Sequence, residues 1–114
     1  MNDETLLERI QTIVDDMKGR DVTLIDLERK SSLAGYMLVV SGTSQRHLMG
    51  IAQKIYDTLK HEVTVRIEGG SANTGWVLVD ADGVILHLFL PEVRDHYDVE
   101  SLWQEAFFQK RKMH

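Results

Sequence analysis

Apolar residues recur every three or four positions in two segments of the chain, which is the spacing of one face of an α-helix. The first segment covers residues 4–17 and ends before Gly19, a residue that can close a helix in the left-handed conformation. The second runs over residues 48–59 and follows a Ser-Gly-Thr-Ser stretch at 41–44, whose hydroxyls can cap a helix start. Both segments therefore predict amphipathic helices.

Five shorter segments have the length and pattern of β-strands. Residues 36–40 form a continuous apolar run, which is typical of a strand buried on both faces. Residues 63–67 alternate between polar and apolar, and residues 22–27 predict a further strand despite its polar members. Residues 76–80 and 84–90 flank a short connection containing Asp-Gly, the signature of a β-hairpin.

Pro91 stops the last strand because proline cannot donate to a sheet. Residues 92–97 then predict a helical turn or short helix. Residues 99–107 predict a final helix, which ends in three cations at 110–112 that suit its C-terminal dipole.

The order of these elements predicts the fold class. A strand, a helix and a strand over residues 36–67 imply a parallel pairing, and the hairpin implies an antiparallel one. We therefore expect an α/β fold: a small mixed β-sheet of about five strands with helices packed on it, as one domain spanning residues 1–114.

Composition agrees with one small globular domain and excludes several classes. The chain has 114 residues, of which 43% are hydrophobic and 27% charged. It has no cysteine, which excludes disulfide scaffolds and thiol catalysis. No apolar run approaches the ~20 residues that span a bilayer. The acidic N-terminus lacks the basic start and apolar stretch of a secretory signal, so a soluble cytoplasmic protein is expected.

Negative charge is concentrated in one block. The net charge is −5, and residues 61–100 hold eight acidic and two basic side chains. Proteins that grip nucleic acid usually present a basic face, so this block argues against direct DNA binding and against more than a minor RNA contact. It suits a basic protein partner, although an acidic surface kept for solubility remains an alternative.

Candidate chemistry is sparse. Residues 41–44 could cradle an anion or simply cap a helix, and they lack the P-loop pattern. Asp80 and Asp82 could hold a metal, but they straddle a predicted turn where aspartate is favoured for backbone reasons. His87 lies within an apolar strand and has no second histidine at ligand spacing. We therefore predict no metal site, no cofactor and no catalytic residue.

Two aromatic residues stand out as candidate contacts. Trp76 and Tyr97 each lie at the edge of a predicted element beside acidic residues. Tryptophan and tyrosine are common in binding hot spots, although both could equally serve packing. Alternation along the hairpin strand places His87 and Phe89 together on one face of the sheet, with Leu86 and Leu88 on the other.

Two stretches carry a family resemblance. SGTSQRH at residues 41–47 and WVLVDADGVILHLFLPEVRDHYDVESLW at residues 76–103 resemble segments of the Iojap-like family, the bacterial ribosomal silencing factors. Residues 21–26 and 30–33 also resemble it. The resemblance covers about residues 5–103 and implies a small mixed α/β domain similar to a pared-down nucleotidyltransferase.

The same resemblance implies a function without catalysis. Members of the family bind the large ribosomal subunit through its fourteenth protein, block joining of the small subunit, and so repress translation when nutrients are short. No cofactor is implied, and a homodimer of the free protein stays possible.

Resemblance and charge together suggest a docking face. Trp76 and Tyr97 would be its anchors, Glu92 would pair with basic groups and Arg94 would fix geometry. The expected contact residues are Trp76, His87, Phe89, Glu92, Arg94 and Tyr97. The alternative is a nucleotide-binding or nucleotidyltransferase-like enzyme, with residues 41–44 holding the nucleotide and Asp80 and Asp82 holding a metal.

Overall fold

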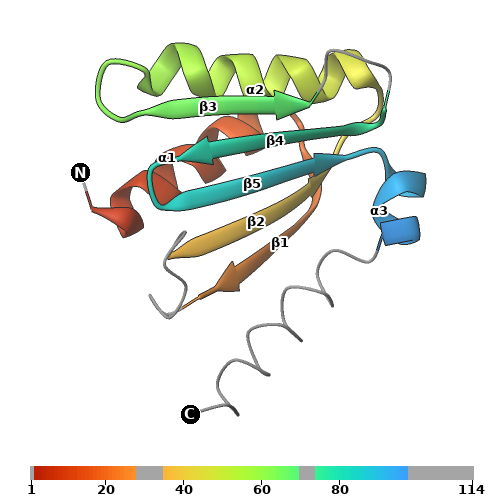
Figure 1. Ribbon diagram of the computed structural model, residues 1–114, viewed down its shortest axis with the longest axis horizontal. Helices are drawn as coiled ribbons and strands as arrows, with labels where there is room; N and C mark the ends of the chain where they lie inside the picture. Colours follow the sequence, from red (N-terminus) through yellow and green to blue (C-terminus); the bar gives the residue numbers. More distant parts are fainter. Residues whose placement is uncertain (1, 28–34, 70–73, 98–114) are drawn as a thin grey trace.

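A computed structural model of the chain describes residues 2–27, 35–69 and 74–97. In this part of the chain a five-stranded sheet carries three helices (Figure 1). The elements are α1 (Asp3–Asp16), β1 (Arg20–Asp26), β2 (Tyr36–Ser41), α2 (Gln45–Leu59), β3 (Val65–Gly69), β4 (Trp76–Ala81), β5 (Val84–Phe89) and α3 (Pro91–Tyr97). These bounds confirm the predicted elements to within a few residues. The predicted final helix and the family segment at residues 30–33 lie outside the described residues.

The strands lie in the order β1-β2-β5-β4-β3, with β2 and β5 parallel and the other neighbours antiparallel. The α/β class, the mixed sheet and the hairpin are thus confirmed. The parallel pair was expected between the strands on either side of α2, and that expectation is wrong. Strand β3 runs in the same direction as β2, but β5 and β4 lie between them. The apolar strand β5 takes the central place, while β3, exposed at alternate positions, lies at an edge.

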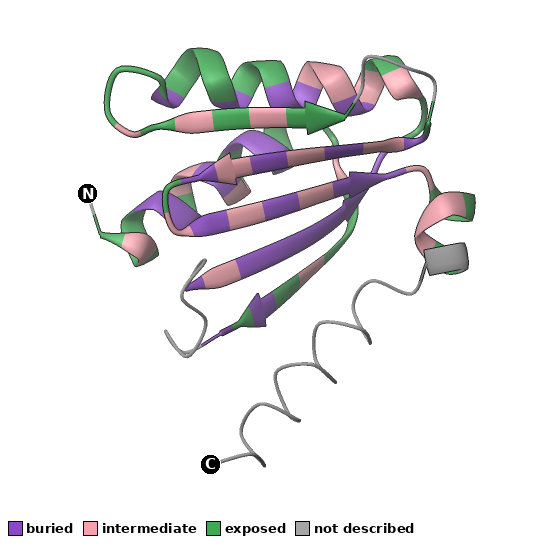
Figure 2. Ribbon diagram, viewed as in Figure 1, coloured by how far each residue is buried: buried purple, intermediate pink, exposed green. Residues whose placement is uncertain are grey.

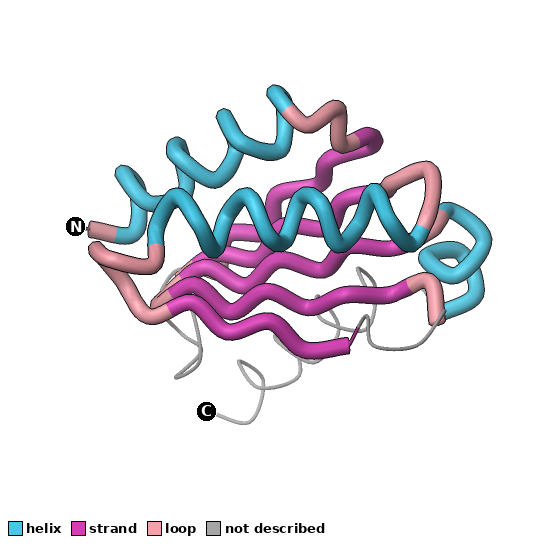
Figure 3. The backbone as a smooth tube through the Cα atoms, turned by 90° about the horizontal axis from the view of Figure 1, so that it is seen from above, coloured by secondary structure: helices cyan, strands magenta, loops and turns pink. Residues whose placement is uncertain are grey.

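Helices α1 and α2 cover one face of the sheet (Figure 3). Buried residues alternate along the strands of the sheet (Figure 2). The apolar stripes of both helices pack on those of one face, which include Leu38, Val40, Leu86 and Leu88. The helical spacing of apolar residues in the sequence therefore predicts which side of each helix packs on the sheet.

The face of the sheet opposite α1 and α2, here called the second face, carries a separate apolar cluster. Ile25, Leu27, Met37, Val39 and Phe89 are buried there, and Val93 of α3 packs against them. Strand β2 is therefore buried on both faces, as its continuous apolar run predicts.

The Ser-Gly-Thr-Ser stretch serves as the start of α2. Ser44 is the N-cap, and its hydroxyl accepts the backbone N–H of His47 at 3.0 Å. The His47 ring accepts the Thr43 N–H at Nδ1 and donates from Nε2 to the Met17 carbonyl at 2.7 Å. This histidine therefore joins the start of α2 to the end of α1. The cap interpretation accounts for the stretch without a bound anion.

The hairpin turn has the geometry that its Asp-Gly predicts. Asp82 and Gly83 both have positive φ, 45° and 112°, as a two-residue turn of the primed type requires. In the part of the chain that the structure describes, no helix is long and apolar enough to cross a membrane.

Removing the α2 cap should measurably destabilise the fold. Ser44→Ala leaves the His47 N–H without its acceptor, which should cost about 1 kcal/mol of unfolding free energy in urea titrations. Ser44→Asp keeps a capping oxygen and is the matched control, expected to stay within a few tenths of wild type. Equal losses in both variants would contradict this role.

Candidate functional site

Three aromatic rings form a stack on the second face, where β4 begins and β5 ends. The register sets Trp76 opposite Phe89 and Leu78 opposite His87. The Trp76 and His87 ring centroids are 6.5 Å apart at an interplanar angle of 29°. His87 and Phe89 are 5.8 Å apart and nearly parallel, at 6°. Side chains two residues apart on one strand share a face, so the pleat of β5 aligns His87 with Phe89.

His87 is held as a neutral ring within this stack. Burial lowers the pKa of His87 from 6.5 to about 4, because desolvation disfavours the charged imidazolium. The indole N–H of Trp76 donates to Nδ1 of His87 at 3.4 Å, which places the ring proton on Nε2. Among the described residues Nε2 has no hydrogen-bond partner, so a buried donor is left unsatisfied.

Two glycines with positive φ shape the surroundings of Trp76. A Cβ added to Gly69 would lie 2.9 Å from the indole ring, so the ring rests directly on the end of β3. A Cβ at Gly75 would lie 2.7 Å from Val93, so α3 approaches the backbone closely there. The Gly75 N–H also donates to Oε1 of Gln45 at 2.7 Å, which ties the start of β4 to α2. Trp76 therefore sits on a rigid frame.

Arg94 fastens α3 to strands β1 and β2. Its guanidinium donates to the Asp21 carbonyl at 2.6 Å, to the Ser41 hydroxyl at 2.9 Å and to the Thr23 hydroxyl at 2.9 Å. Asp21 has a φ of 50° and lies in a register irregularity between Arg20 and Thr23. The planar fork of arginine reaches these separate acceptors from two nitrogens, whereas a lysine would have to contact them from a single ammonium nitrogen.

The expected contact residues are brought together only in part. Trp76 and His87 are partly exposed neighbours, and Glu92 is exposed in the first turn of α3. Phe89 is 3% exposed and supports the other two rings from below the surface. Arg94 is turned inward by its hydrogen bonds. Tyr97 belongs to α3, and its side chain lies outside the described residues.

Three neighbours on the second face were not among the expected contacts. Leu78 lies opposite His87 on β4 and opposite Glu68 on β3. Asp80 lies opposite Ile85 on β5 and opposite Arg66 on β3. The two-residue alternation that starts at Trp76 could have identified Leu78 and Asp80. Glu68 could be identified as a neighbour only from the register between β3 and β4.

The acidic block does not form one surface. Glu62 makes an ion pair with Arg9 at 2.6 Å, and Asp82 lies in the hairpin turn, at the end of the sheet away from Trp76. Glu68 shares the second face with Asp80, whereas Glu92 lies on α3. The sequence block is therefore spread over both ends of the sheet, and only part of it borders Trp76.

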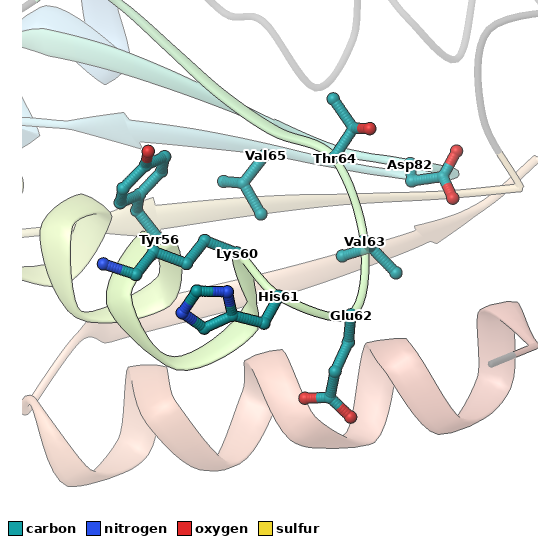
Figure 4. Close-up of a pocket in the computed structure, with 8 residues that line it drawn as sticks. All are labelled: Tyr56, Lys60, His61, Glu62, Val63, Thr64, Val65 and Asp82. Atoms are coloured by element: carbon teal, nitrogen blue, oxygen red, sulfur yellow. The ribbon is translucent and has the colours of Figure 1, made fainter.

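The described residues give little support to metal or nucleotide chemistry. They contain no group of three or more His, Asp or Glu side chains that could hold a metal ion. Asp80 lies on a strand and Asp82 in the turn that follows it. An open hollow of about 500 Å³ lies between the end of α2, the start of β3 and the hairpin (Figure 4). It is lined by Tyr56, Lys60, His61, Glu62, Val63, Thr64, Val65 and Asp82, well away from residues 41–44.

Comparison with known proteins identifies the family. A family model described as "Ribosomal silencing factor during starvation" matches residues 1–114. A ribosomal silencing factor RsfS of Zymomonas mobilis is 41% identical over 88% of this chain and 76% of its own length. The RsfS of Bacillus subtilis is 32% identical over 93% of this chain and 91% of its own length.

A solved structure agrees with the fold. The crystal structure of a Chromobacterium violaceum protein superposes with a TM-score of 0.83 at 35% identity, covering 91% of this chain and 88% of that one. The chain belongs to the ribosomal silencing factor (RsfS, Iojap-like) family, which is a family of regulators and not of enzymes.

The desolvated imidazole makes stability depend on pH. Between pH 6.5 and about 4 the unfolded chain binds a proton at position 87 that the folded chain does not, so stability should fall as pH falls. His87→Phe removes this pH-dependent loss. As pH falls from 6.5 to about 4, the free energy of unfolding of H87F should therefore rise relative to that of wild type by up to about 3 kcal/mol. Urea unfolding at stepped pH measures the difference.

The exposed His61 offers a matched control, because H61F makes the same substitution and leaves the buried ring of His87 in place. Parallel profiles for wild type and H87F would contradict the buried neutral state of His87.

Proposed function

We propose that this chain, as a member of the ribosomal silencing factor family, binds the large ribosomal subunit through its fourteenth protein. The bound chain blocks joining of the small subunit and so represses translation in the cytoplasm under nutrient limitation. Family membership supports the general role. The partly exposed Trp76–His87 pair, on its rigid frame, is the observation that carries the docking assignment.

Trp76 has the properties of a binding anchor. Its ring is held by the His87 stack, by the hydrogen bond to Nδ1 and by contact with Gly69. A partner therefore does not have to immobilise it, and less entropy is lost on binding. Tryptophans in such desolvated, pre-positioned settings dominate interface energetics.

His87 adds an uncharged ring to the anchor. Its Nε2–H is buried and has no acceptor among the described residues, so a partner would meet the exposed part of the ring and not this N–H. Because the ring is neutral, it places no positive charge opposite a basic partner.

Acidic side chains border the aromatic pair. Glu92 is exposed on α3, and Glu68 and Asp80 lie on the second face beside Leu78. Negative groups around an apolar anchor speed encounter with a basic ribosomal protein and disfavour ribosomal RNA.

The indirect role of Arg94 differs from that of a contact residue. Its hydrogen bonds to β1 and β2 hold α3, which carries Glu92 and Tyr97, against the sheet. Arg94 thus fixes the geometry of the docking face from inside. Silencing itself needs no chemistry, since a folded chain seated on the joining surface excludes the small subunit sterically.

Sedimentation with separated ribosomal subunits tests the proposal. The purified chain should co-migrate with the large subunit alone, and later addition of the small subunit should give fewer joined ribosomes. No co-migration at moderate salt would refute the proposed function. Co-migration without reduced joining would refute the steric mechanism.

Truncating the anchor should weaken docking. Trp76→Ala should cost about 2 kcal/mol of binding, close to a thirtyfold loss of affinity for the large subunit. Tyr56 on α2 is the matched control, since it is also an exposed aromatic but lies on the helical side of the sheet. Y56A should bind like wild type; equal affinities of W76A and Y56A would remove Trp76 from the docking face.

Exchanging Arg94 for lysine separates positioning from charge. Arg94→Lys keeps the positive charge but replaces the two donor nitrogens of the fork with one, so both the unfolding temperature and subunit affinity should fall, nearly as far as in R94A. Calorimetry and the sedimentation assay report the two quantities. Wild-type stability and binding in R94K would show that charge alone suffices.

A further inference from the structure

The segment of residues 41–47 carries part of the family resemblance but lies outside the proposed docking face. Its contacts at the start of α2 use Ser44 as the cap and His47 as the link to α1. Between them lies Gln45, the first residue of α2, whose side chain reaches the start of β4. The two elements begin at the same end of the sheet (Figure 1). Gln45 therefore connects this segment to the strand that carries Trp76.

Gly75, the residue before Trp76, is held through both of its backbone polar groups. Its N–H donates to Oε1 of Gln45 at 2.7 Å, and its carbonyl accepts the N–H of Leu90 at 2.9 Å. Gly75 is buried and precedes the first pair of the β4–β5 ladder, Trp76 opposite Phe89. A buried N–H without an acceptor is costly, so the side chain of Gln45 takes the place of a strand partner.

Steric contact fixes the Gly75 backbone as well. Its φ of 75° lies in the left-handed region, which glycine adopts without strain. A Cβ at this position would lie 2.7 Å from Val93 of α3, so the backbone is already close to that helix. The chain therefore enters β4 in contact with α3 and with the amide of Gln45, and it has little freedom to turn.

The contacts of the Trp76 ring are too weak to fix its position alone. The hydrogen bond from the indole N–H to Nδ1 of His87 spans 3.4 Å, which is long for an N–H donor. A shift of the Trp76 backbone by about half an ångström would break it, because hydrogen bonds weaken steeply beyond this length. The indole therefore depends on its own backbone for its place in the stack.

We propose that Gln45 is a positioning residue for the Trp76 anchor. By holding the Gly75 N–H, its side-chain oxygen fixes the backbone from which the indole reaches His87 and the partner. Helix α2 gives this contact a firm base, because its apolar stripe is buried from Leu48 to Leu59. The inference rests on the proposed docking through Trp76, and it gives the segment at residues 41–47 a part in that function.

Only the oxygen of the Gln45 amide has a partner among the described residues. The group that Gly75 presents is a donor, so the oxygen must face it, and Nε2 is buried without a described partner. A glutamate at position 45 could make the same contact, and its charge suits the first turn of a helix. A methionine has a similar length but offers only a weakly accepting sulfur. Gln45→Glu should therefore preserve the role, and Gln45→Met should abolish it.

Tryptophan fluorescence reports the position of the indole without any ribosome. The chain has two tryptophans, so Trp103→Phe leaves Trp76 as the only one. In this background Q45M should shift the emission to longer wavelength and increase its quenching by acrylamide, because the indole leaves its stack with His87 and meets more water. Q45E should retain the parent spectrum and the parent quenching.

Gln53 on the same helix provides a matched control. Its Nε2 donates to Oδ1 of Asp57 at 3.0 Å, and both residues are exposed. Q53M makes the same substitution without touching Gly75, so it should leave the emission and the quenching of Trp76 unchanged. Circular dichroism and unfolding temperature confirm that each variant folds.

Binding to the large ribosomal subunit separates positioning from general support of the fold. Q45M should weaken the affinity about fivefold, since the partner must then order one large side chain itself. In a W76A background the same substitution should cause no further loss, because the group that Gln45 positions is gone. Q45E should bind like wild type in the same sedimentation assay.

Three outcomes would overturn this role. One is an unchanged Trp76 emission and quenching in Q45M. A second is a Q45E variant that changes as Q45M does, which would deny a role to the oxygen. A third is an equal loss of affinity in the wild-type and W76A backgrounds, which would assign Gln45 to the fold alone. If the wild-type chain does not bind the large subunit, the proposed function fails, and the emission spectra still decide whether Gln45 positions Trp76.

Discussion

The parallel pairing of β2 with β5 is the interaction on which the rest of the structure depends. It runs in unbroken register from Tyr36 opposite Val84 to Ser41 opposite Phe89. Both strands contribute buried residues to the helical side and to the second face. Because parallel strands need buried faces, this central pair fixes which residues of its neighbours point inward and which remain at the surface.

The end of the sheet that carries the proposed docking face follows from that pairing. Ser41 and Phe89 end their strands side by side, so Pro91 starts α3 directly beyond them and Arg94 can reach back to the Ser41 hydroxyl. The bulge at Asp21 supplies a further carbonyl for the same guanidinium. One arginine therefore couples α3 to an irregular edge strand. The same contact that holds α3, and with it the proposed docking face, also occupies a backbone carbonyl of β1.

The physical character of the proposed docking surface follows from its frame. The Trp76–His87 pair is apolar, pre-organised and bordered by carboxylates, which suits a lasting contact with a basic protein. Gly69 ends β3 and supports the Trp76 ring, so this surface extends to the edge of the sheet.

The sequence alone determined the elements and their faces, because periodicity records burial. The helical stripes, the two-faced strand β2, the Asp-Gly hairpin and the shared face of His87 and Phe89 could all be predicted from local pattern. Membership of the family could also be recognised from residues 41–47 and 76–103, and Trp76 could be singled out as a candidate contact.

Only the tertiary structure decided which elements meet. Local pattern identifies a strand and its two faces but not its neighbours in the sheet. The pairing of β2 with β5 rather than with β3 is therefore visible only in the tertiary structure. It does not show that Arg94 turns inward, that Phe89 lies beneath the stack, or that the acidic block divides between two ends of the sheet. Each of these depends on contacts between residues far apart in the chain, and such contacts leave no periodic trace in the sequence.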